Sequence, residues 1–243
     1  MELAGRVALV TGAGRRVGRA IATALGARRM RVAVHYNGSV DGAHETASDI
    51  ARAGGEARLF QGDLSTASAP GVLVEQVASA FGGLDVLVNS AAIMARTPLD
   101  TVTPAEWDAT FAINARAPFF TSLAARPYLA ARGGAIVNIA DLAGLETWPA
   151  YIPHGLSKTV VMQMTRALAR TLAPAVRVNA VAPGVILLPD AWQEETGERL
   201  RRTTPLKRLG SVNDVVGAVI YLLEADYVTG ETIVVDGGRH VRR

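Results

Sequence analysis

Near its N-terminus the chain reads Val7-Ala8-Leu9-Val10-Thr11-Gly12-Ala13-Gly14-Arg15-Arg16-Val17-Gly18. The apolar residues at the start predict a buried strand, and a helical pattern begins near residue 16. Glycines in such a turn let backbone N–H groups approach a pyrophosphate, and the helix N-terminus adds partial positive charge. This stretch therefore predicts a strand–turn–helix unit that binds a nucleotide.

The alternation of strand and helix continues to the end of the chain. Mostly continuous apolar runs predict buried parallel strands at residues 7–10, 32–34, 57–60, 86–88, 135–139, 176–181 and 232–235. Helical patterns lie between them, at about 17–29, 42–53, 70–80, 104–130, 153–173 and 211–224. We therefore expect an α/β fold over residues 1–243: a single domain with a doubly wound parallel sheet flanked by helices.

The composition excludes several classes of protein. Of the 243 residues 49% are hydrophobic, which excludes a disordered chain, and the lack of cysteine excludes disulfides and thiolate metal sites. The net charge is +3, and the basic residues do not form the stripe that nucleic-acid binding requires. No apolar run approaches the ~20 residues of a membrane span, and the N-terminus lacks a signal-peptide pattern. We expect a cytoplasmic protein with no metal, nucleic acid or membrane partner.

The end of the second predicted strand bears on the choice of cofactor. An NAD site usually has Asp or Glu there to bind the ribose 2′-hydroxyl, but this chain has no carboxylate before Asp41. Arg15 and Arg16 lie in the glycine-rich turn, where a guanidinium can pair with a 2′-phosphate. These features favour NADPH over NADH, the alternative being that both arginines are simply solvated.

With these features the chain resembles the short-chain dehydrogenase/reductase family over essentially its whole length. The motifs that carry the resemblance are Thr11 to Gly18, Gly62-Asp63-Leu64, Leu87 to Ala92, Asn114, Ile136 to Ile139, Lys158, Arg177-Val178-Asn179, Ala182-Pro183-Gly184, Val228-Thr229-Gly230 and Val235 to Gly238. The resemblance implies a Rossmann-type domain, and family members are commonly homotetramers.

The family pattern also places the cofactor. Asp63 is expected at the adenine edge, with Asn89 and Lys158 on the ribose side. The complete set of expected cofactor residues is Gly12, Arg15, Arg16, Val17, Gly18, His35, Tyr36, Asn37, Ser39, Asp63, Leu64, Asn89, Ser90, Ala91, Lys158, Pro183 and Gly184.

Three departures from the family pattern point in one direction. Arg16 replaces the second motif glycine, the second strand ends in His35-Tyr36-Asn37-Gly38-Ser39, and Asp141 replaces the catalytic serine. All three resemble pteridine reductases and bacterial dihydromonapterin reductases, and the ending at residues 236–242 also resembles dihydromonapterin reductases. Those enzymes hold an aromatic residue near Ile93, which this chain lacks.

A fourth departure concerns the acid. The family's Tyr-x-x-x-Lys motif reads His154-Gly155-Leu156-Ser157-Lys158, whose i,i+4 spacing puts both terminal side chains on one helical face. Imidazole titrates near neutrality, so His154 is a competent proton donor. Asp141 is expected to orient the substrate or help deliver the proton. Asn114 is expected to support a water relay to Lys158.

Three residues are expected to contact the substrate: Ile93, Trp148 and Tyr151. Trp148 offers a replacement aromatic face, although tryptophan is more often simply packed. Tyr151 lies one turn before His154 and is a second candidate acid, with a packing or substrate-contact role preferred. Residues 190–198 are expected to form a flap over the substrate.

These features predict an NADPH-dependent oxidoreductase that acts on a small molecule. The leading expectation is hydride transfer to a pterin-like C=N bond. The alternatives are reduction of a ketone or 3-oxoacyl thioester, and a non-catalytic NADPH-binding sensor. An ionised Asp141 cannot donate a hydrogen bond to a carbonyl oxygen, which counts against the carbonyl alternative without excluding it.

Overall fold

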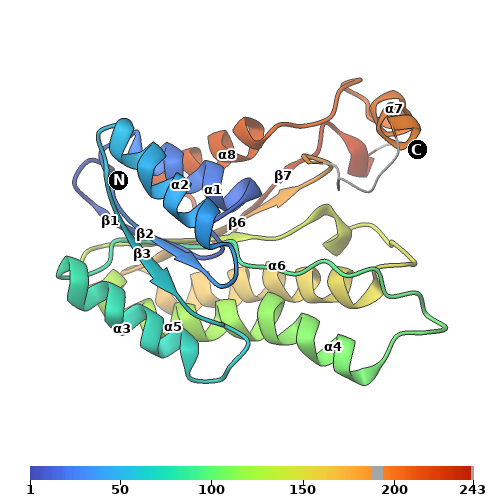
Figure 1. Cartoon of the computed structure of the whole chain (residues 1–243). Coiled ribbons are helices and arrows are strands. Elements are labelled where there is room, and N and C mark those ends of the chain that lie inside the picture. Colours follow the sequence, from blue (N-terminus) through green and yellow to red (C-terminus); the bar gives the residue numbers. More distant parts are fainter. Residues whose placement is uncertain (188–193, 242–243) are drawn as a thin grey trace.

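A parallel sheet forms the centre of the computed structural model, which describes residues 1–187 and 194–241 (Figure 1). The strand order is β3-β2-β1-β4-β5-β6-β7, and every neighbouring pair is parallel. In chain order the strands are β1 Val7–Val10, β2 Arg31–Tyr36, β3 Glu56–Gln61, β4 Val86–Asn89, β5 Ala135–Ile139, β6 Arg177–Pro183 and β7 Thr232–Val235. The predicted doubly wound fold is confirmed, with several strands longer than expected.

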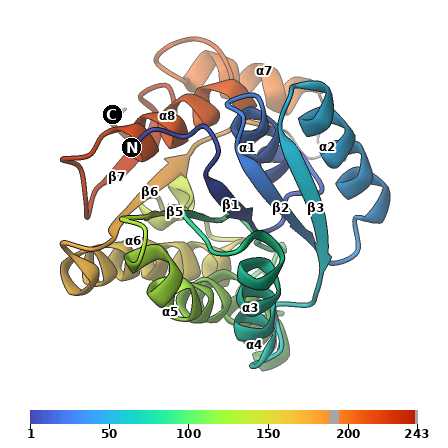
Figure 2. The ribbon, with the colours of Figure 1, turned by 90° about the vertical axis from the view of Figure 1, so that its left-hand side faces the viewer.

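Helices cover both faces of the sheet (Figure 2). One layer holds α1 (Arg16–Gly26), α2 (Val40–Arg52) and α8 (Val212–Glu224), and the other holds α3 (Ala69–Phe81), α5 (Ala117–Ala130) and α6 (Ile152–Leu172). The strand β1 serves both cores, because Ala8 and Val10 face the first layer while Val7 and Leu9 face the second. A strand buried on both faces must be apolar throughout, as its sequence is.

The helical pattern predicted at 104–130 is interrupted. It begins as α4 (Pro104–Phe111), passes through a π-helical turn η1 (Ala112–Arg116) and continues as α5. The N–H of Ala117 donates to the carbonyl of Ala112, five residues back. Pro118 has no N–H to donate to the carbonyl of Asn114, which weakens regular α-helical bonding at this point. The π-turn therefore lies at an expected site residue, Asn114.

The short connecting helices lie at the carboxyl ends of the strands. They are η2 (Leu142–Gly144) after β5 and η3 (Arg239–Val241) after β7. The helix α7 (Glu194–Thr203) was missing from the predicted helices, because its charged sequence lacks an apolar stripe. Part of the expected flap at 190–198 lies outside the described residues.

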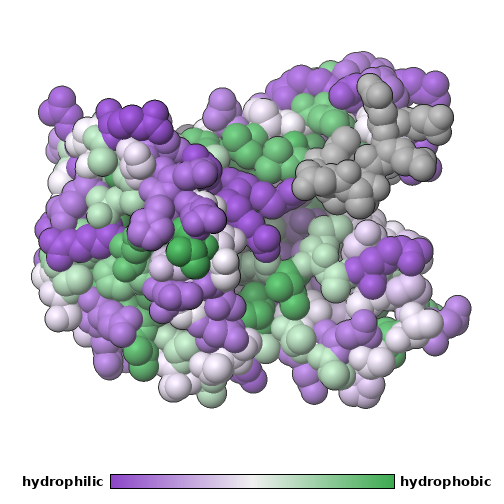
Figure 3. All heavy atoms as spheres, viewed as in Figure 1, coloured by the Kyte–Doolittle hydropathy of each residue, from purple (hydrophilic) through white to green (hydrophobic). Residues whose placement is uncertain are grey.

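The ends of β1, β4, β5 and β6 meet at one edge, where the surface is hollowed between the upper and lower layers (Figure 3). Open α/β sheets bind ligands at this edge, where the chain changes direction across the sheet. Among the described residues, no helix is long and apolar enough to cross a membrane, and no cluster of acidic or histidine side chains is placed to hold a metal.

Candidate functional site

The glycine-rich turn after β1 fits tightly against the loop after β4. Gly12 has a φ of +66°, and a Cβ there would lie 2.8 Å from the Cα of Ala91. A Cβ on Gly18 would lie 2.2 Å from the carbonyl oxygen of Gly12. The hydroxyl of Thr11 accepts hydrogen bonds from the N–H groups of Ser90 and Ala91, at 3.0 and 3.1 Å. These positions therefore require glycine for close approach of backbone to backbone.

Two arginines stand at the start of α1. Arg15 is the N-cap residue in an extended conformation and makes no side-chain cap, and the first turn of α1 contains no acidic residue. Arg16 has a φ of +52°, the left-handed conformation that the family's glycine suits. Its guanidinium donates to the carbonyl oxygen of Leu187 at 3.0 Å. Both arginines are exposed beside a helix N-terminus, an arrangement that attracts an anion.

The structure places His35 inside the protein, against the glycine-rich turn. Its Nδ1 accepts from the N–H of Gly12 at 3.2 Å, so the ring proton is on Nε2, which donates to the carbonyl of Gly62 at 3.1 Å. Burial lowers the pKa of His35 to about 4, partly opposed by the bond to Gly62. Neither ring nitrogen is left for a ligand, so the side chain supports the turn rather than contacting the cofactor directly.

Several other expected cofactor residues also have internal partners. The amide of Asn89 donates to Ser122 at 3.1 Å and to Asn138 at 2.9 Å, within a buried polar network. Tyr36 and Leu64 belong to the two hydrophobic cores. These side chains position the backbone, which was not evident from the motif because the motif does not show side-chain direction.

The remaining members of the set lie at the hollowed edge. Asp63 is exposed, and hydrogen bonds from Ser65 hold its pKa below the ordinary value. Asn37 is exposed and Ser39 half-buried after β2. Val17 and Gly184 are half-buried, and Pro183 is buried at the end of β6. Their roles as cofactor residues stay predictions.

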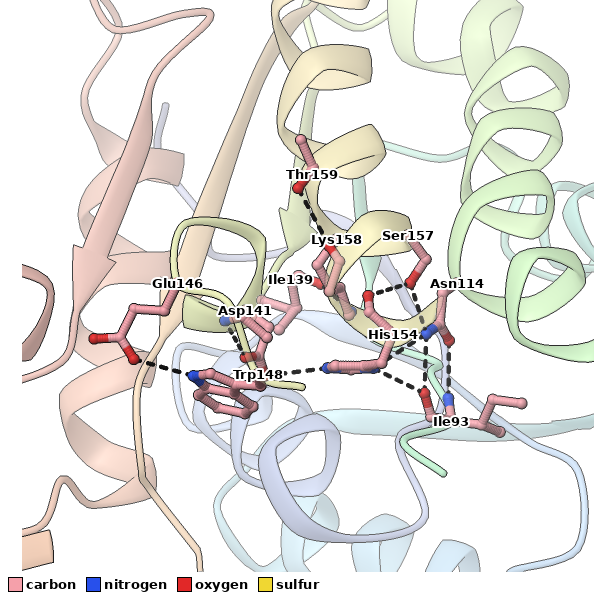
Figure 4. A network of polar contacts seen from close by, with 12 residues as sticks. Ile93, Asn114, Ile139, Asp141, Glu146, Trp148, His154, Ser157, Lys158 and Thr159 are labelled. Carbon is pink, nitrogen blue, oxygen red and sulfur yellow. Dashed lines mark hydrogen bonds and ion pairs between the residues drawn. The ribbon is translucent and has the colours of Figure 1, made fainter. Parts of the chain in front are cut away.

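The expected catalytic residues converge from three elements (Figure 4). Asp141 follows β5 as the N-cap of η2, and one of its oxygens accepts from the N–H of Ala143 at 2.8 Å. His154 and Lys158 lie on the first turns of α6, and Asn114 comes from the π-turn. The second carboxylate oxygen of Asp141 lies 3.7 Å from Nε2 of His154. The structure thus brings these four residues together, and their catalytic roles stay predictions.

Lys158 is buried, and its ammonium donates to the carbonyl of Ile139 at 2.8 Å. Desolvation lowers the pKa of Lys158 to about 8, partly opposed by the negative charge of Asp141. A buried cation of this kind contributes a local positive potential at the end of β5.

His154 is held on one side only. Its side chain is 3% exposed, and its Nδ1 lies 3.1 Å from the carbonyl oxygen of Ile93. Within the described part of the chain, its Nε2 has no hydrogen-bond partner. Buried polar atoms are normally paired, so an unpaired nitrogen beside Asp141 is a mark of a reactive position.

Asn114 fixes the backbone that holds His154. Its side-chain oxygen accepts from the N–H of Ile93 and its amide donates to the carbonyl of Ile93, both at 2.9 Å. The amide also donates to Ser157 at 3.0 Å, whose hydroxyl donates to the carbonyl of His154 at 2.6 Å. Ser157 and the Ile93 carbonyl were not among the predicted site groups. Ser157 lies three residues after His154, a helical spacing from which its position near His154 could have been predicted. A backbone carbonyl leaves no such signal in the sequence.

Trp148 and Tyr151 form an aromatic pair before α6. Their ring centroids are 6.3 Å apart in an edge-to-face arrangement, and both residues are half-buried. The indole N–H of Trp148 donates to Glu146 at 3.0 Å, and Glu146 lies 3.8 Å from the guanidinium of Arg239 in η3. Glu146 and Arg239 were not predicted, because they are far apart in the sequence. The side chain of Ile93 is 37% exposed.

The chain is similar to known reductases over nearly its whole length. Residues 12–240 match the family described as enoyl-(acyl carrier protein) reductase. A Streptomyces violaceoruber protein assigned as ketoacyl reductase 2 of the granaticin polyketide synthase is 38% identical, over 97% of this chain and 96% of its own. The 3-oxoacyl-(acyl-carrier-protein) reductase of Staphylococcus aureus is 36% identical, over 96% of this chain and 98% of its own.

Two solved structures are also similar to the chain over nearly its whole length. The angucycline C-6 ketoreductase with bound NADP is 33% identical, with a TM-score of 0.91 over 99% of this chain and 98% of its own. A Sinorhizobium meliloti protein assigned as a short-chain alcohol dehydrogenase is 35% identical, with a TM-score of 0.94 over 100% of this chain and 99% of its own.

Proposed function

The chain belongs to the short-chain dehydrogenase/reductase family, and on that basis we propose that it is an NADPH-dependent ketoreductase. Its substrate is a ketone or a 3-oxoacyl thioester, whose carbonyl becomes a secondary alcohol. The observation that carries the proposal is the buried, unpaired Nε2 of His154 at the carboxyl ends of the strands. The ketoreductase names of the relatives favour a carbonyl over the pterin-like C=N bond expected first.

The turn after β1 fits NADPH. Its glycines let the backbone approach a pyrophosphate, and the exposed Arg15 and Arg16 suit a 2′-phosphate. When bound, NADPH supplies the hydride for the reduction. The angucycline ketoreductase, similar over nearly the whole chain, has NADP bound.

The chain's own residues handle the proton and the electrostatics. His154 donates a proton from Nε2 to the substrate oxygen, and Asp141 stabilises the positive charge that the ring carries before transfer. Lys158 adds a positive potential that stabilises negative charge developing on that oxygen. Asn114 positions the loop of Ile93 against His154.

The mouth of the site suits an apolar substrate. Each of three loops that follow parallel strands exposes large apolar side chains: Ile93 and Met94 after β4, Leu145 after β5 and Leu187 after β6. Trp148 and Tyr151 add aromatic surface beside them. A bulky or ring-shaped ketone would bury this surface on binding.

A dihydropterin is the second candidate substrate, favoured by one specific observation. Asp141 stands where the family has serine, and its second oxygen faces His154 rather than a backbone donor. A carboxylate at this point suits the amino-imine edge of a pterin.

The test is NADPH oxidation with three substrate classes: cyclic aromatic ketones, 3-oxoacyl N-acetylcysteamine thioesters and dihydropterins. We expect turnover with a carbonyl class, and a loss of about 10²–10⁴-fold in His154→Ala with NADPH affinity unchanged. Turnover of dihydropterins alone would select the second candidate. NADPH binding with no turnover on any class would support the sensor alternative.

A further inference from the structure

The contacts of His154 determine which ring nitrogen carries the proton. A carbonyl oxygen only accepts hydrogen bonds, so the 3.1 Å contact between Nδ1 and the Ile93 carbonyl requires a hydrogen on Nδ1. Asn114 lies 3.4 Å from Nδ1, but its two amide hydrogens are directed to Ile93 and to Ser157. The bond from the Ile93 N–H to the Asn114 oxygen fixes that amide orientation. A neutral His154 therefore carries its proton on Nδ1.

This arrangement affects the reaction, because Nε2 faces Asp141. In the neutral ring Nε2 carries a lone pair and no hydrogen, so it cannot donate a hydrogen bond. It faces a carboxylate oxygen of Asp141 at 3.7 Å. Only the imidazolium has a hydrogen on Nε2. In the described part of the chain, the charged groups that face this region are Asp141 at the start of η2, whose oxygen lies 3.7 Å from Nε2, and Lys158 one turn further along α6. The polar groups that contact the ring from the loop after β4 and from the π-turn are the neutral Ile93 carbonyl and the Asn114 amide.

We propose that the Ile93 carbonyl, held by Asn114, locks His154 with its proton on Nδ1, so that His154 acts as an acid only as an imidazolium paired with Asp141. In reduction, the Nε2–H bond breaks and an O–H bond forms on the substrate oxygen. The ring is left neutral with Nδ1–H still bonded to Ile93, and a proton from solvent recharges Nε2. The neutral ring is then a ready base for the reverse reaction, alcohol oxidation with NADP⁺.

The lock is tested first without any substrate. The chain has only four histidines, so ¹⁵N-labelled imidazoles can be assigned with His44→Gln, His240→Gln and His35→Gln variants of the full-length protein. At a pH where the rings are neutral, we expect His154 to show a protonated Nδ1 and a bare Nε2. His35 is an internal reference with the opposite pattern. A neutral His154 protonated on Nε2 would overturn the proposal.

Asn114→Ala tests the positioning step. Without the clamp on Ile93, the neutral ring of His154 should populate both tautomers, a spectroscopic change that simple loss of stability does not produce. Thr159→Ala is the matched control, because it removes a hydroxyl of α6 that bonds to Gly144 and Gly155 and leaves the bonds of Asn114 to Ile93 and Ser157 in place. Equal spectra for wild type and Asn114→Ala would contradict the positioning role.

The pH dependence of turnover tests the acid, and this part rests on the proposed function. We expect kcat/KM for ketone reduction to fall about tenfold per pH unit on the alkaline side, while alcohol oxidation rises. His154→Tyr should move the decline of kcat/KM to higher pH, because the pKa of a phenol is about 10. Asp141→Asn, which can still cap η2, should move it to lower pH. Identical profiles in all three proteins would overturn the acid role. No ketone turnover at all would defeat the proposed function while leaving the tautomer result intact.

Discussion

His35 and His154 are both buried at the carboxyl edge of the sheet, but their environments differ. His35 has a partner for each ring nitrogen, and its neutral form supports the turn after β1. His154 has a partner for Nδ1 and none for Nε2 among the described residues. The same side chain thus has both ring nitrogens hydrogen-bonded in one region and only one in the other, where we propose that it is the reacting acid. The difference teaches that the partners of the ring nitrogens, rather than residue type or burial, distinguish the two histidines.

If that distinction holds, changes near His154 should alter turnover, and changes near His35 should alter stability or cofactor affinity. After His154→Ala, the largest effect is expected for Lys158→Met. Loss of the buried ammonium should lower kcat/KM for ketone reduction by about 10²–10³-fold, because the positive potential at the substrate oxygen is lost. The free energy of unfolding should stay equal or rise, since an apolar group replaces a desolvated charge.

Steady-state kinetics and urea unfolding on the same protein check both parts of this prediction. Lys207→Met is the control, because Lys207 is the other lysine and is exposed. A Lys158→Met enzyme with wild-type turnover would remove Lys158 from the reacting region.

The next effect concerns His35 and pH. The pKa of His35 is about 4 when folded, against an ordinary value of about 6.5, so below pH 6.5 the unfolded chain binds a proton that the folded chain does not. Stability should therefore fall by up to about 3 kcal/mol as the pH drops from 6.5 to 4. In His35→Gln this part of the pH dependence should vanish, with overall stability lowered. Urea unfolding at several pH values measures it, with exposed His44→Gln as control; an unchanged slope in His35→Gln would contradict the assignment.

A smaller effect is expected for the arginines of the turn. Arg15→Ala and Arg16→Gly should each raise the KM for NADPH by about tenfold, the size of one charge-assisted hydrogen bond, and leave the KM for NADH nearly unchanged. Arg16→Gly should also relieve about 1 kcal/mol of strain at a φ of +52°. This gain partly offsets the stability lost with the hydrogen bond from Arg16 to Leu187. Equal losses with both cofactors would show that the arginines do not read a 2′-phosphate.

The smallest effect is expected for Trp148→Phe, which keeps an aromatic ring but removes the bond to Glu146. Loss of the hydrogen bond that positions the ring should weaken binding of a ring-shaped ketone by about 1 kcal/mol. The KM for that ketone should then rise about fivefold with kcat unchanged. A short aliphatic 3-oxoacyl thioester is the comparison substrate and should be affected less. A larger change in kcat than in KM would assign Trp148 to the reaction itself.

The sequence predicted those features that leave a periodic or a motif signal. Continuous apolar runs such as Val86–Val88 identified parallel strands buried on both faces. Asp141, His154 and Lys158 were predicted as a cluster because strand ends meet at one edge and because residues four apart share a helical face. The helix α7 was not predicted, because its charged sequence has no apolar stripe.

The side-chain directions and backbone contacts could not be read from the sequence. The motif assigned His35 and Asn89 to the cofactor. In the structure the ring nitrogens of His35 bond to Gly12 and Gly62, and the side-chain nitrogen of Asn89 bonds to Ser122 and Asn138. The π-turn at Asn114 leaves no periodic signal over five residues. The Ile93 carbonyl, which fixes His154, is common to every residue type and therefore has no signature in the sequence.

The π-turn also has a consequence for the register of the chain. An α-helix turns about 100° per residue, so one additional residue in a turn rotates everything that follows it by that angle. The buried stripe of α5, which includes Ala117, Ala125 and Leu129, packs into the core with this offset. Deleting a single residue between 112 and 116 would leave the composition almost unchanged, yet it would turn Asn114 away from Ile93 or the apolar face of α5 away from the sheet. The chain length of this segment is therefore as strictly constrained as the identity of its side chains.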